Sequence, residues 1–477
     1  MRPSYRPGGR PPVPPDVRTG GPDRKNRDFI RPARADRRLL GSRTGTATLI
    51  IAAALAAAAC SSGGGGGAAP AAAQSSAAPE QTGTLPSGAG TAAPGTAKQV
   101  ATGTPIVFGY VNDDSGAAAA FPDETGGTKA TVAYINNYMN GINGHPIQVE
   151  YCSTDGTPAQ ASSCATQVLQ HNPVAIIGGA DLATSASVPL FVQAGKPYIG
   201  GVAFAGPENT SSLSFQFNGG DTGAWGVMAQ YSVQTLKAKS IAIIYPENGV
   251  AITAAELAKE VAVNMGLKAA DVPLIGQSAT APDSTPAMES ANRSHPDAII
   301  GITTGTQCLS LAQAHQELGI QAPLILPGGC MSTEQIKDGG SAYEGVLSES
   351  GAAPNSPQWA NNPQIQTFLK ALQLYSPKTP STGFATDAFQ TVMDIRQTLL
   401  AIKGPITTDA IVSAFKNTTN GTNWIGPNYN CKNPPIKAVP ALCTIAGEMY
   451  KVENGSNVLV SGWLDPGPYI KTVPGIS

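Results

Sequence analysis

The chain has 477 residues and a formal net charge of −2, but its charge is unevenly distributed along the sequence. The first 43 residues contain 12 Lys and Arg against four Asp, so the rest of the chain has 18 basic and 28 acidic side chains. An acidic body argues against nucleic acid as a partner and against a broad electrostatic contact with a membrane surface.

The N-terminal region has the layout of a bacterial lipoprotein signal. A basic, proline-rich segment (residues 1–43) precedes an apolar stretch (46–59) that is too short to span a bilayer of ~30 Å, which needs roughly 20 residues. The stretch ends in small residues and Cys60, and two serines and five glycines follow. Residues 1–59 are therefore predicted to be a signal peptide and Cys60 the lipidation site. The alternative is an ordinary secretory signal that is cut near Ala59.

A lipid on Cys60 would anchor the protein to the cell membrane at its extracytoplasmic face. Residues 60–103 consist mainly of Ala, Gly, Ser, Pro and Thr, which cannot bury enough surface to form a core, so a disordered tether is predicted. About 370 residues remain for the folded body, which is enough for two lobes of ordinary size. No later run of 18 apolar residues predicts a membrane span.

Strands and helices alternate through the first part of the body. Short apolar runs predict strands at 106–111, 146–151, 174–177 and 197–200, while apolar residues at helical spacing predict helices at 128–138, 158–171 and 185–194. This order is typical of a parallel sheet with right-handed crossovers.

The same pattern restarts near residue 221. Strands are predicted at 240–245, 296–301 and 323–326, with helices at 254–266, 308–318, 362–375 and 385–402. Residues 448–453 and 456–460 are predicted to form a hairpin, because Asn454-Gly455 supplies the positive φ angles of a tight turn. The fold class is therefore α/β with two Rossmann-like lobes.

Six cysteines besides Cys60 occur in close pairs along the sequence. An even number in an oxidising compartment favours disulfides. Nearest-neighbour pairing is predicted because each pair brackets one supersecondary unit: Cys152/Cys164, Cys308/Cys330 and Cys431/Cys443. Metal ligation is the alternative, but no C-x-x-C occurs and the four histidines are scattered. Neither a metal nor a cofactor is expected.

Several segments, taken in their order and spacing, resemble a known family. They are Gly127-x7-Ile135-Asn136, Gly141-Ile142-Asn143-Gly144, residues 174–179 and residues 195–199. Together they resemble the leucine/isoleucine/valine-binding proteins of ABC importers, which are type I periplasmic binding proteins. The likeness extends over residues 104–465.

The resemblance implies a bilobal fold that binds a small solute between its lobes. The first lobe would comprise residues 104–220 and 349–421, and the second 221–348 and 422–470. The crossings would lie at Gly219-Gly220, at residues 349–351 and at Asn420-Gly421, where glycine suits a hinge. The resemblance also implies a monomer with ABC permease subunits in the membrane as partners.

Ligands of doubly wound sheets bind beyond the carboxyl ends of the strands. The candidate ligand-binding residues of the first lobe are Phe121, Asp181, Thr184, Ser185, Ala203 and Ala205, and those of the second are Asn248, Thr303, Thr304 and Gly328. Thr184 and Ser185 have a second interpretation as a helix N-cap. Phe121 is either a wall of the site or part of the core.

One departure from the family bears on the ligand. Amino-acid binders pair the ligand ammonium with a glutamate after the strand that ends here at Leu326, but this chain has Pro327-Gly328-Gly329-Cys330. An unpaired ammonium in a closed site is costly. Either another acid serves (Asp181, Glu247 or Asp387), or the ligand is not an α-amino acid. The hypothesis drawn from this loop is a small carboxylate, amide or other polar organic molecule, not leucine.

No enzyme motif is present: the sequence lacks G-x-S-x-G, G-x-x-x-x-G-K-[ST] and H-E-x-x-H. The sequence therefore predicts a lipid-anchored solute receptor of an ABC importer and not an enzyme. One alternative is a sensory receptor of the same fold that feeds a signalling partner. Another is a structural surface protein whose binding site has decayed.

Overall fold

The computed structural model describes residues 97–116, 120–204, 206–350 and 354–475. The predicted signal peptide, the lipidation site Cys60, nearly all of the predicted tether and the candidate Ala205 lie outside the described residues.

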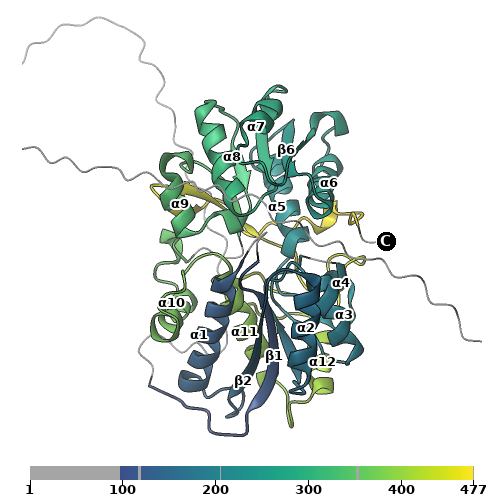
Figure 1. Ribbon diagram of the computed structural model, residues 1–477, viewed down its shortest axis with the longest axis vertical. Helices are drawn as coiled ribbons and strands as arrows, with labels where there is room; N and C mark the ends of the chain where they lie inside the picture. The colour runs from purple at the N-terminus through teal and green to yellow at the C-terminus, as the bar shows by residue number, and fades with distance from the viewer. Residues whose placement is uncertain (1–96, 117–119, 205, 351–353, 476–477) are drawn as a thin grey trace, which may run out of the picture. The chain divides into compact units, whose positions relative to one another are not determined.

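Two sheets organise the described chain, and each defines one lobe (Figure 1). The first is wholly parallel, with the order β2-β1-β3-β4-β5. Its strands are β1 (Ile106–Asp113), β2 (Ile147–Thr154), β3 (Ala175–Gly178), β4 (Tyr198–Ile199) and β5 (Ser214–Phe215). The second has the order β12-β11-β10-β9-β8-β6-β7 and is parallel except at its hairpin edge. Its strands are β6 (Ile241–Pro246), β7 (Leu274–Gln277), β8 (Ala298–Gly301), β9 (Leu324–Leu326), β10 (Leu347–Ser350), β11 (Glu448–Glu453) and β12 (Ser456–Leu459).

Helices cover both faces of the first sheet. Phe108 and Tyr110 of β1 pack toward one face, where α1, α10 and α11 lie, whereas Val111 packs toward α2 and α3 on the other. Successive side chains of a strand point to opposite faces of the sheet, and here helices bury both faces, so β1 is apolar almost throughout. The helices of this lobe are α1 (Pro122–Tyr138), α2 (Pro158–Leu169), α3 (Thr184–Gln193), α4 (Gly206–Thr210), α10 (Pro363–Tyr375), α11 (Phe384–Leu400) and α12 (Thr408–Lys416).

The second sheet is covered in the same way. Ile241 and Ile243 of β6 pack against α5 and α6, and Ala242 and Ile244 pack against α7 and α8. The helices of this lobe are α5 (Gly220–Gln234), α6 (Gly249–Asn264), α7 (Thr285–Asn292), α8 (Thr306–Glu317) and α9 (Thr333–Gly339). Short 3-10 helices are η1 (Ala269–Asp271), η2 (Gly328–Cys330), η3 (Gly340–Ala342), η4 (Pro357–Trp359) and η5 (Gly467–Tyr469).

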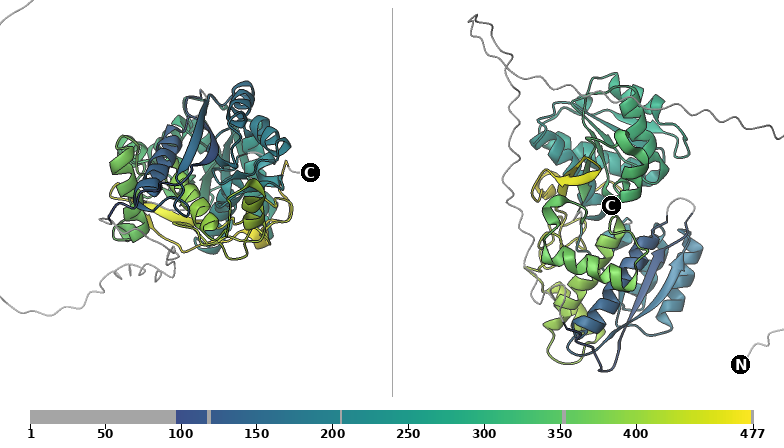
Figure 2. Two further views of the ribbon diagram at one scale, coloured as in Figure 1. Left: turned by 90° about the horizontal axis from the view of Figure 1, so that it is seen from below. Right: turned by 90° about the vertical axis from the view of Figure 1, so that its left-hand side faces the viewer.

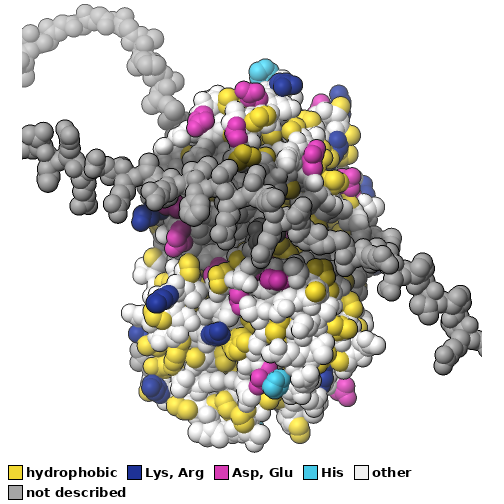
Figure 3. Space-filling view, viewed as in Figure 1, with side chains coloured by type: hydrophobic (Ala, Val, Ile, Leu, Met, Phe, Trp, Pro, Cys, Tyr) yellow, Lys and Arg dark blue, Asp and Glu magenta, His cyan; other side chains and the backbone are white. Residues whose placement is uncertain are grey.

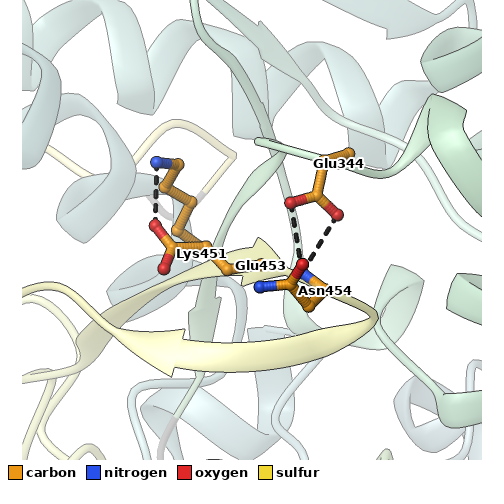
Figure 4. A network of polar contacts seen from close by, with 4 residues as sticks. All are labelled: Glu344, Lys451, Glu453 and Asn454. Carbon is orange, nitrogen blue, oxygen red and sulfur yellow. Dashed lines mark hydrogen bonds and ion pairs between the residues drawn. The ribbon is translucent and has the colours of Figure 1, made fainter. Parts of the chain in front are cut away.

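The C-terminal hairpin β11–β12 returns to the second sheet (Figures 1 and 2). Asn454 and Gly455 have φ angles of 52° and 73°, as the predicted tight turn requires. Glu344 accepts hydrogen bonds from the Asn454 N–H with both carboxylate oxygens at 3.1 Å, and Lys451 pairs with Glu453 at 2.9 Å (Figure 4). The predicted hairpin is confirmed.

Most predicted elements are present, with two informative differences. Helix α1 begins at Pro122, six residues before the predicted start, because its first two turns carry Thr, Gly and acidic residues without an apolar period. Helix α5 was not predicted at all. Ten of its 15 residues are buried, including Gln230 and Ser232, so it lacks the one-sided apolar stripe that marks an amphipathic helix.

The three predicted disulfides are confirmed. Cys152 is bonded to Cys164, Cys308 to Cys330 and Cys431 to Cys443. The first joins β2 to α2 and the second joins α8 to η2. Each bond therefore fastens neighbouring elements of one lobe.

The segment after α12 contacts the cores of both lobes. Trp424, Ile425 and Tyr429 pack in the core that contains α1 and α11. Leu442 and Ile445 pack with the second lobe. This segment therefore contacts both cores, and the crossing at Asn420-Gly421 stays a prediction.

Basic side chains are scattered singly among acidic ones on the face shown in Figure 3. Within the described ranges, no helix combines the length and apolar character that crossing a membrane requires.

Candidate functional site

The loops that follow β1 and β3 are joined by Asn112, the next-to-last residue of β1. Its fully buried side chain accepts the Ala180 N–H at 2.8 Å and donates to the Phe121 carbonyl at 2.9 Å and to Asp114 Oδ1 at 2.7 Å. These bonds hold Phe121, the residue before α1, in a fixed position relative to the β3–α3 loop. Asn112 was not predicted as a site residue, although an amide at the end of an apolar strand was a visible signal.

Three phenylalanines meet beyond these strand ends and are named here the phenylalanine cluster: Phe121, Phe204 and Phe384. The ring of Phe121 lies 5.8 Å from that of Phe204 and 4.8 Å from that of Phe384. Phe121 is 7% exposed, whereas the other two are half-buried. A methyl group on Gly329 of the second lobe would lie 3.6 Å from the Phe384 ring, so a second-lobe loop approaches this cluster.

Thr184 and Ser185 have different surroundings although they are adjacent. The Thr184 hydroxyl is buried and donates to Glu208 Oε2 at 2.7 Å, while Ser185 is exposed. The N-cap position of α3 is Ala183, so neither residue has the capping role that the sequence offered as an alternative.

Asp181 is fully buried and accepts the Ala183 N–H at 2.9 Å. Burial raises the pKa of its carboxyl group, and the neighbouring Asp113 raises it further. Asp181 therefore faces the loops at the ends of β1 and β2.

The loop after β4 runs directly into the crossing between the lobes. The Phe204 N–H donates to Glu208 Oε2 at 3.0 Å. Ala203 is fully buried, and its carbonyl accepts the Asp221 N–H at 3.3 Å. Ala203 thus contacts the start of α5.

The candidates of the second lobe lie at the carboxyl ends of β6, β8 and β9. Asn248 is exposed and caps α6 by accepting the Ala251 N–H at 2.9 Å. Thr303 is buried and Thr304 is exposed, while Gly328 begins η2. The three loops bring these residues to one edge of the second sheet, because parallel strands end there together.

Acidic residues occupy the first turns of two helices that pack tightly. Asp123 and Glu124 belong to α1 and Asp387 to α11. The helices approach closely at Gly127, where a methyl group would lie 2.7 Å from the Ala385 carbonyl. The Ala385 N–H also donates to Asp123 at 3.3 Å. A helix N-terminus favours negative charge, so both first turns suit carboxylates.

Two further acids come from the crossings between the lobes. Glu349 is the next-to-last residue of β10 and lies over Gly447, where a methyl group would be 2.5 Å from its Oε1. Asp221 is the second residue of α5. Asn218 precedes the crossing and donates to Asp387 at 3.3 Å. Asp123, Glu124, Asp387, Glu349 and Asp221 are named here the acidic cluster.

The charged form of each of these carboxyl groups is disfavoured. Burial raises the pKa of Asp387 to about 7, and the charge of Asp123 adds to this. Burial raises the pKa of Glu349 to about 8, and Asp387 and Asp221 contribute. Burial also raises the pKa of Asp221 to about 7. The pKa of Glu124 is raised well above its ordinary value by burial and by the charges of Asp387 and Asp123.

Of the three acids that the sequence offered as replacements for the missing glutamate, only Asp387 belongs to the acidic cluster. Asp181 lies beside Asp113, and Glu247 is exposed and lies over Gly276 of β7. The other four members were not predicted as site residues. The signal for two of them was Pro122 followed by two acids, which is typical of a helix start.

Two surface cavities lie apart from these residues. One of about 590 Å³ is lined by α11, α12 and Tyr429, and one of about 450 Å³ by β7 and α7. No candidate ligand-binding residue lines either. In the part of the chain that the structure describes, no group of three or more His, Cys, Asp or Glu side chains has the arrangement of a metal site.

Solved structures that are similar to this chain include substrate-binding proteins of ABC transporters. A fatty acid ABC transporter substrate-binding protein from Thermomonospora curvata has 18% identity and a TM-score of 0.65, covering 80% of this chain and 98% of its own. A leucine-binding protein from Thermotoga maritima has 17% identity and a TM-score of 0.62, covering 76% and 99%. A solute-binding protein from R. palustris in complex with 4-hydroxybenzoate has 21% identity and a TM-score of 0.61, covering 76% and 96%.

No curated protein is similar enough in sequence to match this chain. The sequence model of the periplasmic binding proteins matches residues 105–435. The resemblance drawn from the sequence is thereby confirmed, as is the α/β fold with parallel sheets. This chain belongs to the periplasmic binding protein family, whose members are non-enzymatic receptors of small molecules.

Proposed function

We propose that this protein is the lipid-anchored receptor of an ABC importer and that its lobes close on a small organic solute. The observation that carries the proposal is the meeting of strand-end loops from both lobes, where Gly329 approaches Phe384 beside the acidic cluster. The proteins of similar fold belong to ABC transporters, which favours import over signalling.

Binding would use residues of both lobes. The phenylalanine cluster offers an apolar wall in the first lobe, and the exposed loop at Asn248 and Val250 offers a facing surface in the second. Val250 lies in the first turn of α6 and is 61% exposed, so this apolar side chain has no cover within its own lobe. Closure of the lobes would bury it against the solute.

Hydrogen exchange of the full chain, extracted from membranes in mild detergent, tests this mechanism. A library of metabolites is first ranked by thermal shift, because a solute at 100 times its Kd adds roughly 2.7 kcal/mol of stability. The best solute should slow amide exchange at residues 247–252 and 303–306 while leaving the outer helix α12 unchanged. If no solute in the library alters stability or exchange, receptor function is contradicted.

The anchor is tested separately. Mass spectrometry of the membrane-extracted protein should find Cys60 as a lipidated N-terminal residue. The Cys60→Ser variant should appear in the soluble fraction while keeping the solute-induced thermal shift. Recovery of an unmodified Cys60 would contradict the anchor but not the receptor function.

Transport is tested in the native cell. Deleting the gene should abolish uptake of the labelled solute, and a chromosomal copy should restore it. Unchanged uptake together with a lost transcriptional response to the solute would favour the sensory receptor.

A further inference from the structure

We infer that the acidic cluster, together with the phenylalanine cluster beside it, binds the cationic group of an organic solute that also has an apolar part. The inference rests on the proposed function and names the chemical class of its ligand. It replaces the expectation of a simple carboxylate or amide, which was based only on the missing glutamate of the second lobe.

The two clusters are adjacent because of their places in the chain. Phe121 is the N-cap of α1 and precedes Asp123 and Glu124, while Phe384 begins α11 one turn before Asp387. Since α1 and α11 are in close contact at their starts, aromatic rings and carboxylates share one region. Aromatic faces and carboxylates both attract an organic cation, and the rings also cover its apolar part.

Nothing in the described residues neutralises these acids. The ion pairs among the described residues are His171–Glu150 and Lys451–Glu453, and neither includes an acid of the cluster. No basic side chain is among the groups that shift the pKa of Glu124, Asp387 or Glu349. The groups that lower the pKa values of these acids are neutral, among them the Asn218 amide, the backbone N–H groups of Phe384 and Ala385, and the Trp225 side chain.

Glu124 is the strongest individual indication. Its side chain is fully buried, and neither of its carboxylate oxygens has a hydrogen-bond partner among the residues that the structure describes. Its neighbours are Asp123, Asp387 and the phenol of Tyr110, none of which carries positive charge. A buried carboxylate without a partner is costly, so a cation that arrives with the solute would stabilise the region.

Asp123, Asp387 and Glu349 are partly exposed, so a ligand can reach them, whereas Glu124 is fully buried near Asp123 and Asp387. The arrangement does not fit a metal ion, since no three carboxylates converge as ligands in the described residues. An ammonium group, whose charge is spread over a larger volume, does not require such convergence.

A rival interpretation predicts the opposite dependence on pH. Carboxyl groups with raised pKa values are protonated near neutral pH and could donate hydrogen bonds to an anionic solute. An anion would then bind better at low pH. A cation instead binds more tightly when acids of the cluster such as Asp387 and Glu349 are ionised, so its affinity must rise with pH.

Quaternary ammonium ions are suitable probes because their charge does not change with pH. Choline, tetramethylammonium and benzyltrimethylammonium would be titrated into the full chain at pH 6 and pH 8.5 by calorimetry. Uncharged 3,3-dimethylbutan-1-ol is the shape-matched control for choline, and benzoate is the anionic probe. If an acid with a pKa of 7 must ionise, its ionised fraction is about tenfold lower at pH 6 than at pH 8.5. The Kd of at least one cation should therefore fall about tenfold between these pH values.

Isosteric variants place the effect on the acidic cluster. Asp387→Asn and Glu349→Gln should each weaken binding of that cation about tenfold or more and reduce its pH dependence. Asp394→Asn is the matched control, because Asp394 is a buried acid on the same helix that only accepts the Trp424 N–H at 2.7 Å. Its cation affinity should equal that of the native protein.

Three outcomes would overturn the inference. In the first, no cation gives a larger binding signal than NaCl at the same concentration at either pH. In the second, the uncharged alcohol binds as well as choline, and in the third, benzoate binds more tightly at pH 6 than at pH 8.5 while no cation binds. In each case a metabolite that still slows exchange in the second lobe leaves the proposed function intact. If neither cations nor library metabolites change stability or exchange, both fail.

Discussion

Glu208 holds two loops of the first lobe through one carboxylate oxygen. Thr184 donates to it from the start of α3 at 2.7 Å, and the Phe204 N–H donates from the β4–α4 loop at 3.0 Å. Glu208 is fully buried, so each donor contributes to satisfying a carboxyl oxygen that water cannot reach. One hydroxyl group thus positions a member of the phenylalanine cluster.

Replacing that hydroxyl group should destabilise the protein even without a solute. For Thr184→Val we expect the free energy of unfolding to fall by roughly 1–3 kcal/mol, because a buried carboxyl oxygen loses a donor. Urea denaturation measures this. The control is Ser185→Ala, which alters an exposed side chain and should change stability by less than about 0.5 kcal/mol. Equal stability of both variants would contradict the structural role of Thr184.

Single residues show where sequence reasoning about the site reached its limit. The carboxyl-end rule located the loops of Phe121 and Gly328, which the structure brings near Phe384 and Glu349. It did not find Glu124, because its relevance arises only when α1 meets a helix more than 250 residues later in the chain. No local pattern encodes that contact.

At the scale of elements, the tight packing of α1 on α11 positions the acidic cluster. Gly127 makes the approach possible, since any side chain there would meet the backbone of Ala385 and the methyl group of Ala388. Glycine inside a helix normally lowers stability relative to alanine, so the close approach gives it a reason to be there.

Gly127→Ala should therefore destabilise the protein by roughly 1–3 kcal/mol, as overpacking does. The matched control is Gly249→Ala at the start of α6, where a methyl group meets nothing within 4 Å. That variant should be neutral or slightly more stable. Thermal unfolding of the two variants measures the difference. A Gly127→Ala variant as stable as the native protein would show that the helices can separate at no cost.

The disulfide Cys308–Cys330 is the second element with a testable role. It closes a longer loop than Cys152–Cys164, with sequence separations of 22 and 12, and it fastens η2, which carries Gly328 and Gly329. Replacing either pair by alanine should cost about 2–4 kcal/mol, with the longer loop costing slightly more in the chain-entropy model.

Only the Cys308→Ala/Cys330→Ala variant should also lose the solute-induced protection of residues 303–306, because only this bond holds a loop that faces the solute. Hydrogen exchange of the two double variants, at a temperature where both remain folded, separates the effects. Equal protection in both variants would limit Cys308–Cys330 to a role in stability.

A helix was predictable from the sequence where one of its faces is apolar, and a strand where it is long enough for its apolar pattern to be recognised. The β1–α2 region and the hairpin have such patterns. The start of α1 and the whole of α5 do not, because their buried positions include Glu124, Thr125 and Gln230. Buried polar residues conceal a helix from hydrophobic periodicity.

At the scale of the whole molecule, the acidic cluster makes stability depend on pH. Asp387 and Asp221 have ordinary pKa values of 3.8 that are raised to about 7, and Glu349 has a value of 4.5 raised to about 8. These groups bind protons more tightly in the folded chain than in the unfolded chain. Their contribution to stability is thus fully present below pH 4 and is lost as the pH rises toward 8.

The melting temperature of the solute-free protein should therefore fall between pH 5 and pH 8.5. A loss of 1 kcal/mol corresponds to roughly 1–2 °C for a folded body of about 370 residues, and several acids contribute together, so a decrease of several degrees is expected. Glu349→Gln and Asp387→Asn should flatten this dependence, because the amide cannot ionise. Asp283→Asn should not, since hydrogen bonds from Thr285 lower the pKa of Asp283, which is already ionised throughout this range.

A saturating cation should restore stability chiefly at pH 8.5, where the cluster is charged. The opposing result is a melting temperature that rises across this range, or one that depends on pH equally in all three variants. Either result would mean that the pKa values of these acids are the same in the folded and the unfolded chain, which would contradict the acidic cluster as a source of pH dependence.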